Sequence, residues 1–146
     1  MMIASIAALV ILTAFLAILM AFAKNDPDDN EILTNKTAAA SVSTALADCT
    51  AITTTDATDL HIHMLMTYHG SATLGGRVKL YASYDDGTNY ESNPFWQFDM
   101  PFTAGATIRY SHQVPPSPKR IKLQVTNLDT GQSITAIYAY YSIQTA

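Results

Sequence analysis

The hydrophobic positions of this 146-residue chain divide it into two regions with different patterns. Residues 1–23 are apolar all round, with Ser5 and Thr13 as their only polar members and no charged residue. At a rise of about 1.5 Å per residue, such a helix would extend roughly 34 Å, enough to cross a hydrocarbon core of about 30 Å. The pattern predicts a buried hydrophobic helix over residues 1–23.

A polar segment rich in Asp and Asn follows this run and contains Pro27. Proline cannot continue a helix, and Asn and Asp favour turns. We expect a hinge or linker over residues 24–37, and we place the start of a second domain at residue 38. The predicted organisation is therefore a helix at 1–23, a linker at 24–37 and a β domain at 38–146.

From residue 38 the chain changes to short segments rich in Val, Ile, Thr and Tyr, separated by turn residues. Alternation is clearest in Arg77–Ser83, where Val78, Leu80 and Ala82 share one face. The predicted strands are Ala40–Leu46, Cys49–Thr55, Leu60–Tyr68, Arg77–Ser83, Pro94–Met100, Thr107–Val114, Arg120–Thr126 and Ile134–Ile143. The predicted fold class is an N-terminal hydrophobic α-helix followed by an all-β antiparallel sandwich of jelly-roll or immunoglobulin-like type.

Charge and cysteine content narrow the function classes. The formal net charge is -4 and every charged residue lies after position 23, so nothing favours nucleic-acid binding. Cys49 is the single cysteine, which excludes an intramolecular disulfide and leaves no zinc-binding spacing. We expect Cys49 to be a small buried residue, with an intermolecular disulfide or a reactive thiol as the alternative. We expect no cofactor.

Three interpretations of residues 1–23 compete. A cleaved secretory signal would use Ala21-Phe22-Ala23 as its cleavage site, but it lacks a basic n-region and exceeds the usual length. A membrane anchor fits the length, although Lys24 would then place the β domain inside. In the third, the helix packs on copies of itself, since small residues three or four apart allow close approach. Those residues are Ala4, Ala7, Ala8, Ala14, Ala17 and Ala21.

An uncharged N-terminal helix ahead of a β-rich head resembles the mature type IV pilins, and the archaeal pilins in particular. Bacterial pilins usually carry Glu at the fifth position, where this chain has Ser5, and archaeal-type pilins lack that Glu. The resemblance implies a basic leader removed before Met1 and a precursor inserted in the membrane. It further implies that the helix later packs against identical subunits in the core of a filament.

We therefore predict a structural subunit of an extracellular, pilus-like homopolymer at the cell surface, with the β domain outermost and no enzymatic activity. Residues 77–143 are also similar in texture to small jelly-roll modules of virion and surface proteins. The alternative function is a membrane-anchored surface or virion binding module that uses its loops or aromatic residues. The aromatic residues of the β domain could form a platform on which a sugar stacks, or they could pack in the core. They are Phe95, Trp96, Phe98, Tyr110, Tyr138, Tyr140 and Tyr141.

No nucleophile, phosphate-loop or dinucleotide motif is present. His61 and His63 fall on one face of a predicted strand, about 7 Å apart, and could ligate a metal with His69, His112 or a carboxylate as third ligand. The alternative is a polar strand face, which would make assembly pH-sensitive. A further candidate site is Asn35, which begins a sequon for N-glycosylation.

Overall fold

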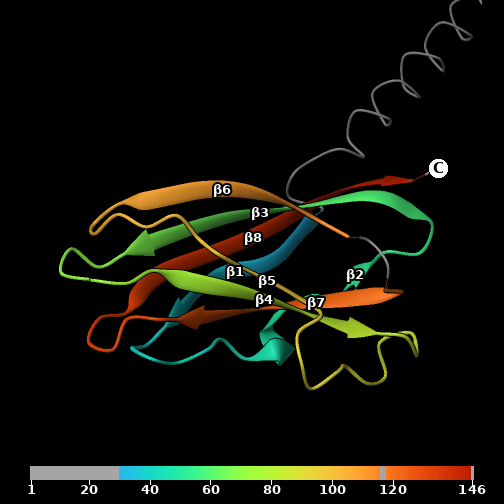
Figure 1. Cartoon of the computed structure of the whole chain (residues 1–146), viewed down its shortest axis with the longest axis horizontal. Coiled ribbons are helices and arrows are strands. Elements are labelled where there is room, and N and C mark those ends of the chain that lie inside the picture. Colours follow the sequence, from blue (N-terminus) through green and yellow to red (C-terminus); the bar gives the residue numbers. More distant parts are fainter. Residues whose placement is uncertain (1–29, 116–117, 146) are drawn as a thin grey trace, which may run out of the picture. The chain divides into compact units, whose positions relative to one another are not determined.

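The computed structural model describes residues 30–115 and 118–145, which form a sandwich of two four-stranded antiparallel sheets (Figure 1). The elements are β1 (Glu31–Ala38), η2 (Leu46–Asp48, a single 3₁₀ turn), β2 (Ile52–Thr53), β3 (Ala57–Tyr68), β4 (Gly76–Ser83), β5 (Trp96–Asp99), β6 (Thr107–Val114), β7 (Arg120–Asn127) and β8 (Ile134–Thr145). One sheet has the strand order β1-β8-β3-β6, and the other has the order β2-β7-β4-β5.

This order is that of a jelly roll. Strands that are consecutive in the chain belong to different sheets, except for β4 and β5, which pair as neighbours in one sheet. Interleaved antiparallel strands in two four-stranded sheets are the hallmark of the double Greek key. β6 ends one sheet and β5 ends the other.

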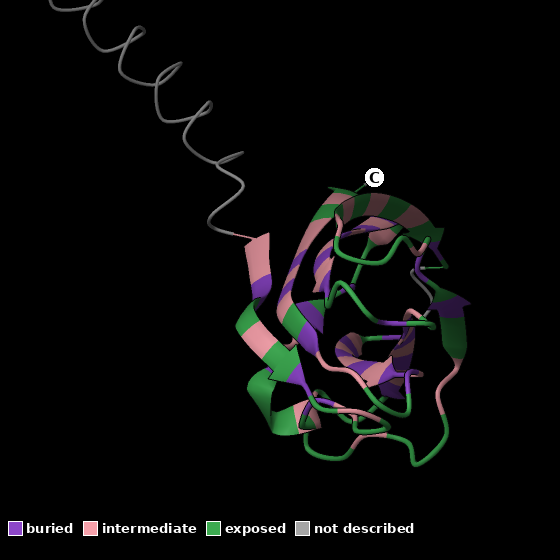
Figure 2. Cartoon of the chain, turned by 90° about the vertical axis from the view of Figure 1, so that its left-hand side faces the viewer, coloured by how far each residue is buried: buried purple, intermediate pink, exposed green. Residues whose placement is uncertain are grey.

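The core lies between the sheets and follows from period-two alternation. Along β3, Ile62, Met64, Met66 and Tyr68 are each at most 2 % exposed, whereas the residues between them are half-buried. The predicted inward residues of β4 are likewise buried. Figure 2 shows the resulting bands of buried and half-buried residues along the strands. Burial of these apolar side chains, at about 25 cal/mol per Å², is the main driving force for the sandwich.

The predicted fold class is wrong in placing a helix ahead of the sandwich. The structure is an all-β sandwich, and its described residues contain no α-helix. Within residues 30–115 and 118–145, no helix is long and apolar enough to span a membrane. Residues 1–23 lie outside the described residues, as do all six alanines proposed for helix packing.

The β domain begins earlier than the sequence predicted. Residues 31–37, which we assigned to the linker, belong to β1, which pairs with β8. The pairing shifts register three times along this strand, and Asn35 has a left-handed φ of 43°. Such irregularities interrupt the alternation of apolar and polar residues, so the segment resembled a linker.

The predicted strand Ala40–Leu46 is also wrong. Ser41 adopts a left-handed φ of 59°, only Ser43 forms an isolated bridge with Thr126, and η2 follows at once. Thr44 packs its hydroxyl against β7, where the oxygen accepts a hydrogen bond from the Val125 backbone N–H at 3.0 Å. The segment therefore lies beside β7 without forming a continuous ladder.

Candidate functional site

An aromatic cluster covers the side of the sandwich on which β5 and β6 are the edge strands of the two sheets. Trp96 and Phe98 come from β5, and Tyr110 and His112 from β6. All four occupy inward positions, because their cross-strand partners on β4 and β3 are buried core residues. An inward-facing residue on an edge strand has a neighbouring strand on one side only, so it is only partly covered. Trp96 accordingly remains 38 % exposed.

The cluster holds its rings in a defined arrangement. The Trp96 Nε1–H donates a hydrogen bond to His112 Nε2 at 3.3 Å. The His112 ring stacks on Phe98, with ring centroids 4.1 Å apart and planes 17° from parallel. The ring centroid of Tyr110 lies 6.1 Å from that of Phe98, and Tyr110 is the fourth member of the cluster. Each ring is thus fixed by another, which orients the indole without covering it.

A cavity of about 260 Å³ lies beside the indole. Its lining consists of Thr58, Asp59, Trp96, Gln113, Val114 and Pro115. The Gln113 side-chain amide donates to Asp59 Oδ1 at 2.9 Å, and His61 Nε2 lies 3.1 Å from Asp59 Oδ2. The Gln113 hydrogen bond, aided by His61, lowers the pKa of Asp59, so its carboxylate is charged at neutral pH. The cavity therefore combines an aromatic surface with a charged acceptor, an amide and a hydroxyl.

The sequence identified only part of this site. Trp96, Phe98 and Tyr110 belong to the predicted aromatic set and are brought together. Tyr138 and Tyr140 instead lie on the outer face of the β1-β8-β3-β6 sheet, opposite Leu65 and His63 of β3. The two remaining members, Phe95 and Tyr141, are partly buried against the core. His112, Asp59 and Gln113 were missed as members, because no local pattern connects them.

His61 and His63 occupy the strand face predicted for them on β3, and His69 does not belong to the strand. The rings of His61 and His63 stack on the outer face with centroids 6.3 Å apart, whereas His69 lies beyond the strand end and accepts a hydrogen bond from the Ser71 N–H. Burial and the neighbouring His61 lower the pKa of His63. Among the described residues, no group of three His, Cys, Asp or Glu side chains could hold a metal ion.

His63 sits between two serines, which raises the question of acyl-transfer chemistry. Its Nδ1 lies 2.8 Å from Ser111 Oγ, and its Nε2 lies 2.9 Å from Ser142 Oγ. Both ring nitrogens are therefore occupied by hydroxyls, and neither contacts an orienting carboxylate in the described part of the chain. Backbone N–H groups on a sheet lie in its plane and are used in the ladder, so they do not form an oxyanion hole on this face. The geometry favours a polar surface over a catalytic dyad.

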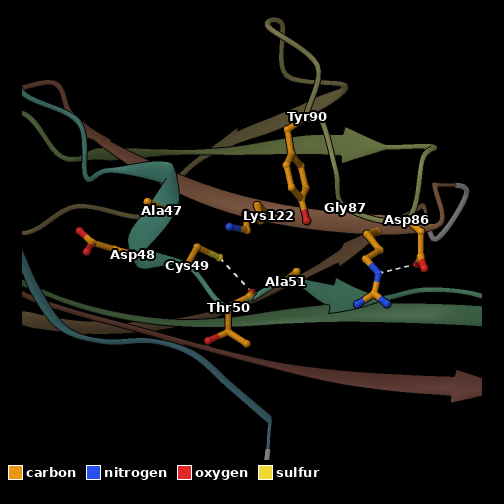
Figure 3. A pocket seen from close by; sticks show the side chains of 10 residues that line it. Ala47, Asp48, Cys49, Thr50, Ala51, Asp86, Gly87, Tyr90 and Lys122 are labelled. Carbon is orange, nitrogen blue, oxygen red and sulfur yellow. Dashed lines mark hydrogen bonds and ion pairs between the residues drawn. The ribbon is translucent and has the colours of Figure 1, made fainter.

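Cys49 is buried, as expected, at 2 % exposure. Its Sγ donates to the Thr50 carbonyl oxygen and accepts a hydrogen bond from the Leu123 N–H at 3.1 Å. Burial raises the pKa of the thiol to about 11, which opposes nucleophilic chemistry. The adjacent pocket, lined by Tyr90, Asp86 and Lys122 among others, is shown in Figure 3.

Asn35, the candidate glycosylation site, is exposed on β1. Its side chain is therefore accessible, which the modification requires. Glycosylation itself stays a prediction.

Neither a protein-family model nor a curated protein matches this sequence. Solved structures with a similar fold include the infectious bursal disease virus VP2 subviral particle, at 16 % identity and a TM-score of 0.46 over 77 % of this chain and 30 % of that chain. A carbohydrate-binding module of Cellvibrio mixtus lichenase 5A, in complex with cellotriose, has 14 % identity and a TM-score of 0.38 over 78 % and 92 % of the two chains. A Bacillus endospore appendage, described as a disulfide-linked pilus, has 8 % identity and a TM-score of 0.35 over 79 % and 89 %.

These similar structures are a virus subviral particle, a carbohydrate-binding module and an endospore appendage. This chain spans under a third of the VP2 chain. Each is under 20 % identical to this chain with a TM-score below 0.5, so none of them identifies its function. No family match supports the type IV pilin resemblance.

Proposed function

We propose that this chain is a non-enzymatic surface module that binds carbohydrate at the Trp96 cavity. The observation that carries this proposal is an indole 38 % exposed yet held in place by His112, directly beside a cavity with a charged carboxylate.

The chemistry of the cavity fits a sugar better than other small ligands. A pyranose ring has an apolar C–H face that packs on an aromatic surface, and a rim of hydroxyls that need hydrogen-bond partners. Trp96 supplies the aromatic surface, and Asp59 accepts hydrogen bonds from hydroxyls. Gln113 and Thr58 add an amide and a hydroxyl. The cavity volume of about 260 Å³ matches a single sugar ring rather than a whole oligosaccharide.

Affinity electrophoresis through gels containing single soluble polysaccharides tests the proposal. Because residues 1–23 are uncharged and apolar, the full chain is kept in a nonionic detergent. We expect retardation by at least one neutral glycan, loss of retardation in Trp96→Ala, and normal retardation in Tyr84→Ala. Tyr84 is 59 % exposed outside the site and serves as the matched aromatic control. Equal retardation of both variants, or none for the parent chain with any glycan, would refute the proposal.

A second candidate function, the homopolymeric filament subunit, is favoured by the edge strand β6. This strand pairs with β3 over eight residues without a register shift, and in the described part of the chain it ends its sheet. Regular unprotected edges are templates for strand addition, and Arg109 is the single charged residue of β6. Polymerisation through β6 predicts that Ser111→Pro, which removes a backbone donor, shortens the polymers seen by negative-stain microscopy. Monodisperse monomers of the parent chain would refute it.

A further inference from the structure

A second polar pocket lies on the β2-β7-β4-β5 sheet, between the segment around η2, the loop after β4 and the strand β7 (Figure 3). Its volume is about 380 Å³. Ten residues line it: Ala47, Asp48, Cys49, Thr50, Ala51, Asp86, Gly87, Tyr90, Arg120 and Lys122. The lining is mainly polar, and two of its side chains are cationic.

The pocket is lined by two carboxylates and two cationic side chains, but both carboxylates pair with cations other than Lys122. Asp86 accepts a hydrogen bond from Arg120 Nε at 2.8 Å, and Asp48 is paired with Lys36 at 3.1 Å. Both carboxylates of the pocket are therefore committed to other cations. In the described part of the chain, no carboxylate lies within ion-pair distance of Lys122, whose Nζ lies 5.2 Å from the centroid of the Tyr90 ring. The ammonium of the half-buried residue Lys122 is thus without a carboxylate partner among the described residues.

A glycine in the loop after β4 leaves space in the pocket. Gly87 has a φ of +90°, a conformation that other residues rarely adopt. A Cβ at this position would lie 3.1 Å from Arg120 Cδ and 3.4 Å from the Tyr90 hydroxyl oxygen. The glycine therefore leaves room between the guanidinium and the phenol. Arg120 is fixed there by two partners, Asp86 and the Thr53 hydroxyl at 3.1 Å.

The phenol supplies a neutral donor at the same place. Burial raises the pKa of Tyr90, so its hydroxyl keeps its proton at neutral pH. Figure 3 shows the ring of Tyr90 beside Lys122 in the pocket. A fixed guanidinium, an unpaired ammonium and a hydroxyl donor together provide several N–H and O–H groups.

We propose that this pocket binds an oxyanion: the carboxylate, sulfate or phosphate group of a ligand. The group would pair with the Lys122 ammonium and accept hydrogen bonds from the Tyr90 hydroxyl and from Arg120 N–H groups not used by Asp86 or Thr53. A charge-assisted contact of this type compensates the ammonium more fully than the Tyr90 ring face does. The site is independent of the Trp96 cavity.

Lys79 provides a matched control for a merely solvated lysine. It lies on the outer face of the same sheet, opposite Gln124 of β7, and shares the half-buried state of Lys122. It lines none of the pockets described above. A general attraction of anions to basic side chains would therefore involve both lysines, whereas a built site would involve Lys122 alone.

Amide chemical-shift titration of the full chain in nonionic detergent tests the proposal, with glucuronate, sulfate and phosphate as probes and glucose and chloride as controls. We expect saturable shifts around Cys49, Gly87 and Tyr90 with one or more oxyanions at constant ionic strength. Lys122→Gln should weaken binding at least tenfold, and Lys79→Gln should leave it unchanged.

Shifts that persist in Lys122→Gln would overturn the proposal, and so would shifts reproduced by chloride at equal ionic strength. The absence of any saturable response to all three oxyanions would do the same. Which oxyanion binds tightest distinguishes a carboxylate ligand from a sulfated or phosphorylated one. The Trp96→Ala variant should retain oxyanion binding, so the two sites fail or succeed separately.

Discussion

The Trp96 indole N–H donates to His112 Nε2 across the gap between the two sheets, over 3.3 Å. The bond joins the last strand of one sheet to the last strand of the other. The same imidazole stacks on Phe98. It therefore accepts the indole hydrogen bond through Nε2 and packs on Phe98 through its ring face. The orientation of the exposed tryptophan therefore depends on one residue of the facing sheet.

Replacing His112 by Phe should retain the stacking on Phe98 and remove the acceptor for the indole. The hydrogen bond contributes about 0.5–1.5 kcal/mol to orientation. We therefore expect carbohydrate affinity at Trp96 to fall roughly 2- to 10-fold, since 1.4 kcal/mol is a factor of about ten. Isothermal titration of the parent chain and the His112→Phe variant measures this. Unchanged affinity would show that the hydrogen bond does not position the indole.

Cys49 should be unreactive in the native protein. Its thiol is 2 % exposed and burial raises its pKa to about 11, so little thiolate is present at pH 8. We expect an aromatic disulfide reagent to label it at pH 8 only after unfolding in denaturant. The variant Ala47→Cys, at an exposed position of the 3₁₀ turn that precedes Cys49, should react rapidly at one thiol in the native state. Rapid labelling of native Cys49 would contradict its assignment as a structural residue.

Asn127 connects the end of β7 to two neighbouring segments. Its Nδ2 donates to the carbonyl oxygens of Ala38, Ala39 and Gln132, and its Oδ1 accepts from the Asp129 N–H. The residue is 1 % exposed, so Asn127→Ala would leave buried polar groups without partners. Each such group costs about 1–3 kcal/mol, and we expect a loss of at least about 2 kcal/mol in the free energy of unfolding.

Urea denaturation followed by circular dichroism measures this loss. The control Thr130→Ala changes an exposed residue of the adjoining loop and should alter the midpoint little. Similar midpoints for the two variants would show that Asn127 does not hold these segments together.

Stability should fall at acid pH through two aspartates. The Asn89 backbone N–H, with the Ser83 and Asn89 side chains, lowers the pKa of Asp85 from 3.8 to about 2. Hydrogen bonds from the backbone N–H groups of Thr73, Gly131, Leu74 and Gln132 lower the pKa of Asp129 as well. In the unfolded chain these groups bind protons at higher pH than in the native protein. Their contribution is therefore complete above the unfolded pKa and is lost as the pH falls through the folded one.

Thermal unfolding between pH 7 and pH 2 checks the sign. The melting temperature should decline below about pH 4, and Asp85→Asn should make the decline shallower. The exposed Glu91→Gln variant provides the control and should follow the parent chain. A steeper decline in Asp85→Asn would contradict the lowered pKa of Asp85.

Regular alternation made much of the β domain predictable. Val78, Leu80 and Ala82 alternate with polar residues, and the structure buries all three. The two faces of β3 were predicted for the same reason. β1 was missed because bulges and the left-handed Asn35 interrupt the period of two. Alternation is a property of regular pairing, so it fails where the ladder is irregular.

The candidate site was predictable only in its residue types. Trp96 and Phe98 are close in sequence, but Asp59 and Gln113 are 54 residues apart and meet because β3 pairs with β6. That pairing depends on strand order, which the hydrophobic pattern does not encode. The Trp96–His112 contact further requires that two sheet ends face each other. The aromatic residues of the site could be predicted from the local sequence, whereas its polar residues come together only through the strand order.

Trp96 is the single tryptophan of the chain, so fluorescence excited selectively at tryptophan reports on the proposed site. Titration of the full chain in nonionic detergent with a panel of neutral oligosaccharides is therefore the most direct test of carbohydrate binding. We predict a saturable change in tryptophan emission with at least one oligosaccharide, weakened at least tenfold by Asp59→Ala and unaffected by Tyr84→Ala. Emission that stays constant across the panel, or a response that Asp59→Ala leaves intact, would contradict the account.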